Sequence, residues 1–391
     1  MKTSLVALWI AVMMSAGVSA TAAKPFVPSG DDVVVERLPE QGDPALKELK
    51  RIRAALAKDP RNLGIAAAVA RRTMEAARAT GDPRFLGQAQ AALTPWWTVA
   101  DPPSVALLLR ATLKQSQHDF DGAIKDLDRL LTREPTNGQA LLTRATVLTV
   151  RGDYAGAQSD CRRLAQRTSE LVVTSCVAGA TSLSGDADEA YRTLAEALAR
   201  PGDPPGIRAW ALTLAAEIAA RRGDADAADL HFREAFILDP RDAYLRAAYA
   251  DFLLDIGRPR DVLPLLRSET RNDSLLLRLA LAEQRLPDAS ASFDVHRADL
   301  AARFDAARAR GDTLHQREEA RFRLAIEGNV RAALALARDN WNVQREPADL
   351  RILAEAARAA NDAGAQKVVD DWVAATRLHD ATLVAARGAR R

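Results

Sequence analysis

The sequence lacks every short motif that commonly marks an enzyme. It contains no Gly-x-Ser-x-Gly elbow, no His-Glu-x-x-His pair, no phosphate loop ending in Gly-Lys-Ser/Thr and no Gly-x-Gly-x-x-Gly turn. Its five histidines never lie at metal-ligand spacing from one another or from a cysteine. We therefore predict that the protein is not an enzyme and uses no cofactor or metal ion. An active site assembled from scattered residues would escape such a search.

Excess charge and long apolar runs are also missing. A formal net charge of +2 gives no global electrostatic reason to expect a nucleic-acid partner. No stretch after the amino end approaches the roughly 18 uninterrupted apolar residues of a membrane-spanning helix. We therefore expect no stable membrane insertion of the mature chain.

The amino end has the pattern of a secretory signal peptide. Lys2 is the only charge before an apolar run from Leu5 to Met14, and small residues around Ala20 and Ala22 follow. The alternative, a membrane anchor, needs about 20 apolar residues. No cysteine follows either small-residue site, so a lipid anchor is disfavoured. We predict a signal peptide over 1–22 and a periplasmic location, where disulfides persist.

From Pro44 onwards the sequence has the period of amphipathic helices. Leu46, Leu49, Ile52 and Leu56 recur at three- and four-residue steps between polar flanks. Asp-Pro pairs, which suit the start of a helix, recur at 43, 59, 82, 101, 203 and 239. A chain of 391 residues is long for a single core, so this punctuation indicates several domains or a repeat array.

One pattern repeats in five windows, which open at Ser104, Gly138, Leu171, Ala209 and Ala243. The eighth position of each window is alanine, and the twentieth is alanine or valine. Small residues at these positions let two antiparallel helices cross closely. The larger side chain at the twenty-fourth position fills the gap beside the crossing. Most of the intervening turns contain glycine followed by aspartate, which suits the end of one helix and the cap of the next.

This pattern resembles the tetratricopeptide-repeat family, whose 34-residue unit is a helix-turn-helix with small residues at those two positions and a proline near its end. The best matches are the stretches 119–135, 152–164 and 223–240. The resemblance implies an all-α fold, an α-solenoid of stacked antiparallel helix pairs that curl into a right-handed superhelix. The insertion at 201–206 and Arg321 at an eighth position depart from the family pattern.

We expect the following organisation along the chain. A signal peptide over 1–22 precedes an extended or disordered lead over 23–43, which could alternatively add a strand to a partner's sheet. A helical region of degenerate repeats over 44–103 leads into five repeats over 104–271. Degenerate repeats and a capping helix span 272–380, where Trp372 and Val373 are expected to cover an exposed apolar face. A basic tail over 381–391 follows.

The resemblance further implies a concave groove lined by the first helix of each unit, where a peptide or helix of a partner sits. Aromatic anchors dominate interfaces, so Trp210 and Tyr244 are the strongest candidates. The residues that fall at groove positions are Leu108, Thr112, Gln115, Thr143, Thr146, Thr149, Trp210, Thr213, Glu217, Arg221, Tyr244, Asp251 and Asp255.

Two functions remain open at this level. The first is a periplasmic scaffold or adaptor that binds another protein or peptide through its groove, in envelope biogenesis or export. The alternative is a glycan- or ligand-binding protein of cell-wall or exopolysaccharide metabolism, with Trp96, Trp97 and Trp210 stacking on sugar. The two adjacent tryptophans lie between prolines at 95 and 102, so we expect a loop that plugs the junction between repeats.

The chain has only two cysteines, Cys161 and Cys176. In the repeat register they lie at one height on facing helices of successive units. Two thiolates are too few ligands for a metal, and catalytic pairs favour a Cys-x-x-Cys spacing. A disulfide needs Cα atoms within about 7 Å, which the neighbouring small residues permit. We predict a structural disulfide, with two buried free thiols as the alternative.

Overall fold

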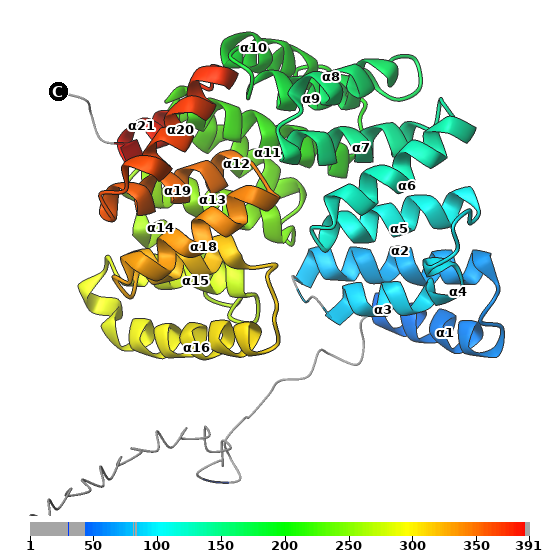
Figure 1. Ribbon diagram of the computed structural model, residues 1–391, viewed down its shortest axis with the longest axis horizontal. Coiled ribbons are helices and arrows are strands. Elements are labelled where there is room, and N and C mark those ends of the chain that lie inside the picture. The colour runs from blue at the N-terminus through cyan, green and yellow to red at the C-terminus, as the bar shows by residue number, and fades with distance from the viewer. Residues whose placement is uncertain (1–29, 31–43, 81, 83, 388–391) are drawn as a thin grey trace, which may run out of the picture. The chain divides into compact units, whose positions relative to one another are not determined.

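The computed structural model describes residue 30, residues 44–80, residue 82 and residues 84–387 (Figure 1). The predicted signal peptide and most of the lead lie outside the described residues. The chain divides into two units, Met1–Glu48 and Leu49–Arg391, and the helices that carry the site belong to the second. In chain order the helices are α1 Pro44–Lys58, α2 Leu63–Thr80, α3 Arg84–Ala92, α4 Thr94–Trp97, α5 Ser104–Ser116, α6 Phe120–Arg133, α7 Gly138–Arg151, α8 Tyr154–Arg163, α9 Glu170–Thr181, α10 Ala187–Leu198, α11 Pro205–Arg222, α12 Ala225–Leu238, α13 Ala243–Asp255, α14 Pro259–Leu266, α15 Asp273–Glu283, the 3₁₀ turn η1 Pro287–Ala289, α16 Ser290–Ala309, α17 Gln316–Ala325, α18 Val330–Val343, α19 Pro347–Ala359, α20 Ala363–Thr376 and α21 Ala381–Arg387.

The predicted all-α solenoid is confirmed. Each of the five windows becomes one helix pair, from α5 and α6 to α13 and α14, and each helix packs on its neighbours in the chain. Asp119, Asp153 and Asp224 cap the second helices with their side chains, as the turn pattern predicts. His118 replaces the glycine of its turn with φ 58°. Among the described residues no strand is present.

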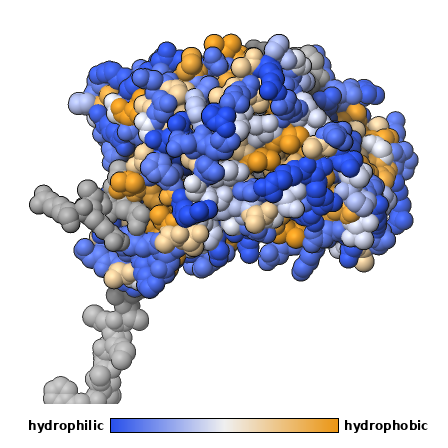
Figure 2. Space-filling model, turned by 90° about the horizontal axis from the view of Figure 1, so that it is seen from above, coloured by the Kyte–Doolittle hydropathy of each residue, from blue (hydrophilic) through white to orange (hydrophobic). Residues whose placement is uncertain are grey.

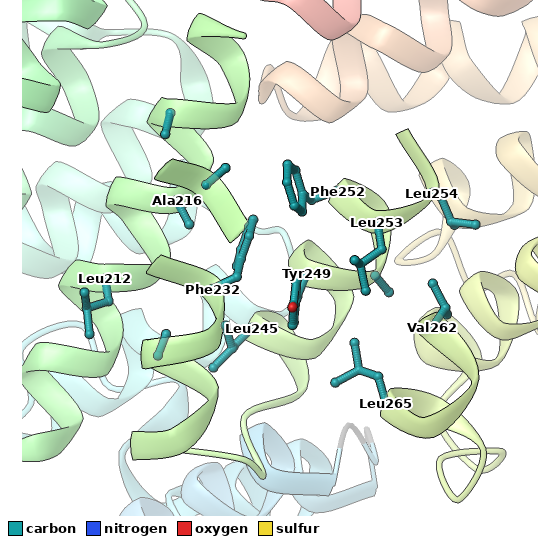
Figure 3. Packing of buried hydrophobic residues seen from close by; sticks show 14 of the residues in the cluster. Leu212, Ala216, Phe232, Leu245, Tyr249, Phe252, Leu253, Leu254, Val262 and Leu265 are labelled. Carbon is teal, nitrogen blue, oxygen red and sulfur yellow. The ribbon is translucent and has the colours of Figure 1, made fainter. Parts of the chain in front are cut away.

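The helix pairs interlock as the small-residue positions predict. Ala216 in α11 and Ala228 in α12 are fully buried, so these two helices cross closely. Phe232, one turn further along α12, fills the space beside the crossing and extends the packing to α13 (Figure 3). Its ring centroid lies 5.2 Å from that of Tyr249 and 5.4 Å from that of Phe252. The apolar contact thus runs from one repeat into the next.

An ion pair joins the two helices of each of the first two repeats, fully buried in the first and partly buried in the second. The Arg110 guanidinium in α5 forms two hydrogen bonds, of 2.7 and 2.6 Å, with the Asp126 carboxylate in α6. The equivalent pair one repeat later is Arg144 and Asp160, with bonds of 2.6 and 2.8 Å. Both pairs are 16 residues apart, because they occupy the same two positions of the repeat.

Arg110 also fixes the segment with the two tryptophans. Its Nη1 donates to the carbonyl oxygens of Trp96, Trp97 and Val99 at 2.8–2.9 Å. This segment begins as the short helix α4 and not as a loop, which corrects the prediction. Both indole rings pack on the cluster around Leu113, so the plugging role is confirmed.

The predicted disulfide is present. Cys161 of α8 and Cys176 of α9 are bonded, with their Cα atoms 5.5 Å apart. Ala157 on α8 and Ala180 on α9 are buried in the same small cluster as Cys161, and their small side chains let the two helices approach. In the chain-entropy estimate a loop of this length contributes about 3 kcal/mol to stability.

The carboxyl-terminal helices fold back onto earlier repeats. The Arg345 N–H donates to the Val150 carbonyl at 2.8 Å, and α21 packs on α11 (Figure 1). Three glycine turns, at Gly152, Gly185 and Gly223, are each covered by a residue from this part of the chain, in order Trp372, Arg377 and Ala381.

Two predictions about the carboxyl end are therefore wrong in detail. Trp372 does not cap a free end of the array, because its ring packs edge-on against Tyr154 of α8 at 6.4 Å and against Trp341 at 5.2 Å. The segment predicted as a basic tail begins with α21, where Leu383 is 2 % exposed. The prediction of a tail depends on the composition of 381–391 alone. Composition cannot show that a short apolar stretch is buried against a helix that is distant in the sequence.

The face seen in Figure 2 is mostly hydrophilic, with hydrophobic residues in separate patches. In the described part of the chain, no helix combines the length and apolar character needed to cross a membrane.

Candidate functional site

The repeats and the returning carboxyl-terminal helices enclose a cavity of about 480 Å³. It is lined by side chains from α7, α9, α11, α12, α13, α15, α17, α19 and the start of α21. Its size is in the range of small-molecule and peptide sites. The apolar part of the lining includes Leu183, Leu214 and Phe252, and the polar part is dominated by arginines and carboxylates.

The cavity collects six of the predicted groove residues. Helix α11 places Glu217 and Arg221 one turn apart, and α13 presents Tyr244 and two aspartates on one stripe. The six residues are Thr149, Glu217, Arg221, Tyr244, Asp251 and Asp255. Residues that the repeat register selects on α7, α11 and α13 therefore lie around one cavity.

The other predicted groove residues lie elsewhere. Thr143 and Thr213 are each only 6 % exposed, and their hydroxyls donate to carbonyls of their own helices. These two side chains are not available to a partner in this structure. Five residues do not line the cavity and are at least partly accessible, namely Leu108, Thr112, Gln115, Thr146 and Trp210.

Ion pairs across the cavity hold α13 to the carboxyl-terminal helices. Arg351 of α19 forms two hydrogen bonds with Asp255 of α13, at 2.6 and 2.7 Å, across 96 residues of sequence. Asp251 binds Arg321 of α17 and Arg278 of α15, the latter at 2.7 Å. Burial opposes the charge of Asp251, but the two arginines outweigh it and hold the pKa of this carboxyl well below its usual range.

These arginines were missed by the sequence prediction. Arg278, Arg321 and Arg351 lie in degenerate repeats, where the register is weak, and arginine is common throughout the chain. The one signal in the sequence was Arg321 itself, which stands where the repeat requires a small residue. In the structure, this arginine forms an ion pair with Asp251.

A hydrogen-bonded acid and phenol form the centre of the cavity. The Tyr244 hydroxyl donates to Glu217 Oε1 at 2.6 Å. Tyr244 is 59 % exposed and lines the cavity. Burial raises the pKa of the Glu217 carboxyl, and the Glu217 charge, followed by burial, raises that of the Tyr244 hydroxyl well above its usual value.

A second polar cluster supports one wall. Arg317 binds Glu346 at 2.9 Å and Asp349 at 3.4 Å. Asp349 is fully buried and accepts hydrogen bonds from Asn340, Gln344 and the Glu346 N–H. Burial raises the pKa of Asp349 to about 7, against the opposing effect of Arg317. This cluster fixes the start of α19, from which Arg351 reaches the cavity.

Most carboxylates of the lining are paired with arginines. Besides the Tyr244–Glu217 pair, the Thr382 hydroxyl donates to the Asp380 carboxylate at 2.7 Å, and both of these residues line the cavity. Within the described ranges, no group of three or more His, Cys, Asp or Glu side chains is placed to hold a metal ion. Trp96 and Trp97 do not line the cavity.

Comparisons with known proteins concern the fold alone. No family model matches the chain, and no curated protein matches it. A structure of the human IFIT1 dimer with m7Gppp-AAAA has a TM-score of 0.50 at 13 % identity, over 85 % of this chain and 77 % of that one. TTC0263, a tetratricopeptide-repeat protein of Thermus thermophilus, has a TM-score of 0.37 at 18 % identity, over 50 % of this chain and 98 % of that one.

Yeast Tom70 has a TM-score of 0.40 at 13 % identity, over 88 % of this chain and 84 % of that one. The chain has the fold of a tetratricopeptide-repeat-like α-solenoid, built from stacked antiparallel helix pairs.

Proposed function

We propose that this protein is a periplasmic adaptor that binds a segment of another protein on the concave side of its repeats, in envelope biogenesis or export. The observation that carries the proposal is a pair of accessible aromatic side chains. Trp210 and Tyr244 occupy the same repeat position on α11 and α13 and are 40 % and 59 % exposed. Large aromatic side chains left accessible in this way are typical anchors of an interface.

Further support comes from the fold and from the disulfide. Repeat solenoids present extended concave surfaces that suit recognition of a peptide segment. A disulfide between Cys161 and Cys176 fits an oxidising compartment, as expected for an exported protein.

Replacing both Trp210 and Tyr244 with alanine is expected to abolish capture of the partner while helical content stays unchanged. The reason is that alanine removes both anchors from a surface that the core does not need. The measurement is affinity capture from a periplasmic extract, read by mass spectrometry, with circular dichroism as the check on folding.

The matched control is Leu230→Ala with Ile237→Ala. These side chains are 55 % and 78 % exposed on α12, the second helix of the same repeat. The control variant should retain the partner. Retention of the same partner by the Trp210 and Tyr244 variant would dismiss the proposed surface.

The cavity favours a second candidate, a ligand-binding protein of cell-wall or exopolysaccharide metabolism. Isothermal titration of the isolated protein with envelope glycans distinguishes the two candidates, because only the second predicts binding.

A further inference from the structure

One arginine of the cavity differs from the others. Four of the five lining arginines form ion pairs with carboxylates, namely Arg278, Arg317, Arg321 and Arg351. Arg221 has no such pair among the described residues. Its Nη2 donates to the Ser182 hydroxyl at 3.0 Å, and its buried Nε–H has no acceptor. The guanidinium keeps its charge in this position, and no described carboxylate forms a direct ion pair with it.

The surroundings of Arg221 define what could neutralise it. Leu214, two turns earlier on the same face of α11, and Leu183, next to Ser182, line the same cavity as Arg221 and supply apolar surface there. Glu217 lies one turn away, but its carboxylate accepts the Tyr244 hydroxyl and not Arg221. Burial raises the pKa of Glu217, and the charge of Arg221 opposes this rise, so the two groups interact through space without forming an ion pair.

The charge of the whole lining limits the ligand further. It holds seven carboxylates and five arginines. The excess of carboxylates repels a doubly charged phosphate ester more strongly than a single negative charge, and Arg221 is the one lining arginine that can pair with that single charge without giving up a described ion pair. We propose that the cavity binds a small amphipathic monocarboxylate, with its carboxylate on the Arg221 guanidinium and its apolar body against Leu183 and Leu214. This site does not depend on the partner proposed above.

Isothermal titration with octanoate tests the site, with octanamide as the uncharged ligand of the same shape. Octanoate should bind the intact protein at one site, and octanamide should bind at least about tenfold more weakly, because a charge-assisted hydrogen bond is lost. Arg221→Gln should weaken octanoate by a similar factor and leave octanamide unchanged. Arg221→Lys should fall between the two, because it keeps the charge but not the fork of donors.

The control is Arg222→Gln on the same helix. Arg222 pairs with Asp188 at 2.6 Å and does not line the cavity, so octanoate binding should be unaffected. Circular dichroism checks the fold of each variant, and Arg221→Lys serves if the glutamine variant does not fold. Three results would each overturn the site: no octanoate binding below its micelle-forming concentration, equal binding of octanamide, or a lysine or glutamine variant with unchanged octanoate affinity.

Discussion

Replacing Arg110 with methionine is expected to lower the free energy of unfolding by about 3–5 kcal/mol. The side chains of Arg110 and Asp126 are 6 % and 4 % exposed. Methionine fills much of the space but leaves the Asp126 carboxylate with Lys114 as its remaining cation. It also removes the donor to three carbonyls of the segment 96–99. Urea denaturation followed by circular dichroism measures the loss.

Arg192→Met is the matched control. Arg192 also pairs with carboxylates, but it and its partner Glu189 are 58 % and 49 % exposed. An exposed pair contributes about 1 kcal/mol or less. Equal stability losses in the two variants would show that the Arg110 network is not buried as described.

The hydrogen bonds between Arg110, Lys114 and Asp126 also make the stability of the protein depend on pH. Burial would raise the pKa of Asp126, but the hydrogen bonds from Arg110 and Lys114 lower it below its usual value. The stabilisation by this ionised carboxylate is therefore present above the ordinary aspartate pKa of about 4 and is lost as the pH falls below it.

Replacing Gly152 with alanine is expected to destabilise the protein by about 1–2 kcal/mol through the backbone and by about 1–3 kcal/mol more through overpacking. Gly152 has φ 82°, and an added Cβ would lie 2.4 Å from Trp372 Cη2. The indole cannot retreat easily, because Trp341, Tyr154 and Arg345 surround it. Denaturation curves and the tryptophan emission spectrum report the change.

Gly257→Ala separates the two contributions. Gly257 has a similar φ of 74°, but no atom lies within 4 Å of an added Cβ. Only the backbone cost applies to this control. If both variants lose the same stability, Trp372 does not pack on Gly152.

The helix pairs could be predicted from the sequence because their determinants are local. Capping aspartates, turn glycines and small residues at the crossing all act within one repeat. The disulfide followed from the same register, since Cys161 and Cys176 lie on helices that are adjacent in the chain. The tetratricopeptide-like pattern was therefore enough to predict the helix pairs and the stacking of successive repeats.

The return of the carboxyl-terminal helices could not be predicted, because its determinants are separated by long stretches of chain. Arg351 and Asp255 look like ordinary surface charges in the sequence, yet they meet across the cavity. The prediction of groove residues from the repeat register was also only partly correct. It identified the stripe of α13 with Tyr244, but it included Thr143, which the structure buries.

The central structural claim is that the chain closes on itself between α13 and α19, and a double-mutant cycle of Asp255→Asn and Arg351→Met tests it most directly. The side chains of this pair are 20 % and 28 % exposed and make two parallel hydrogen bonds. We expect a coupling energy of about 1 kcal/mol or more in the free energy of unfolding. The control cycle on Arg260 and Asp288, which are 66 % and 61 % exposed, should give about 0.5 kcal/mol or less. A coupling near zero for Asp255 and Arg351 would contradict the closure and the cavity that depends on it.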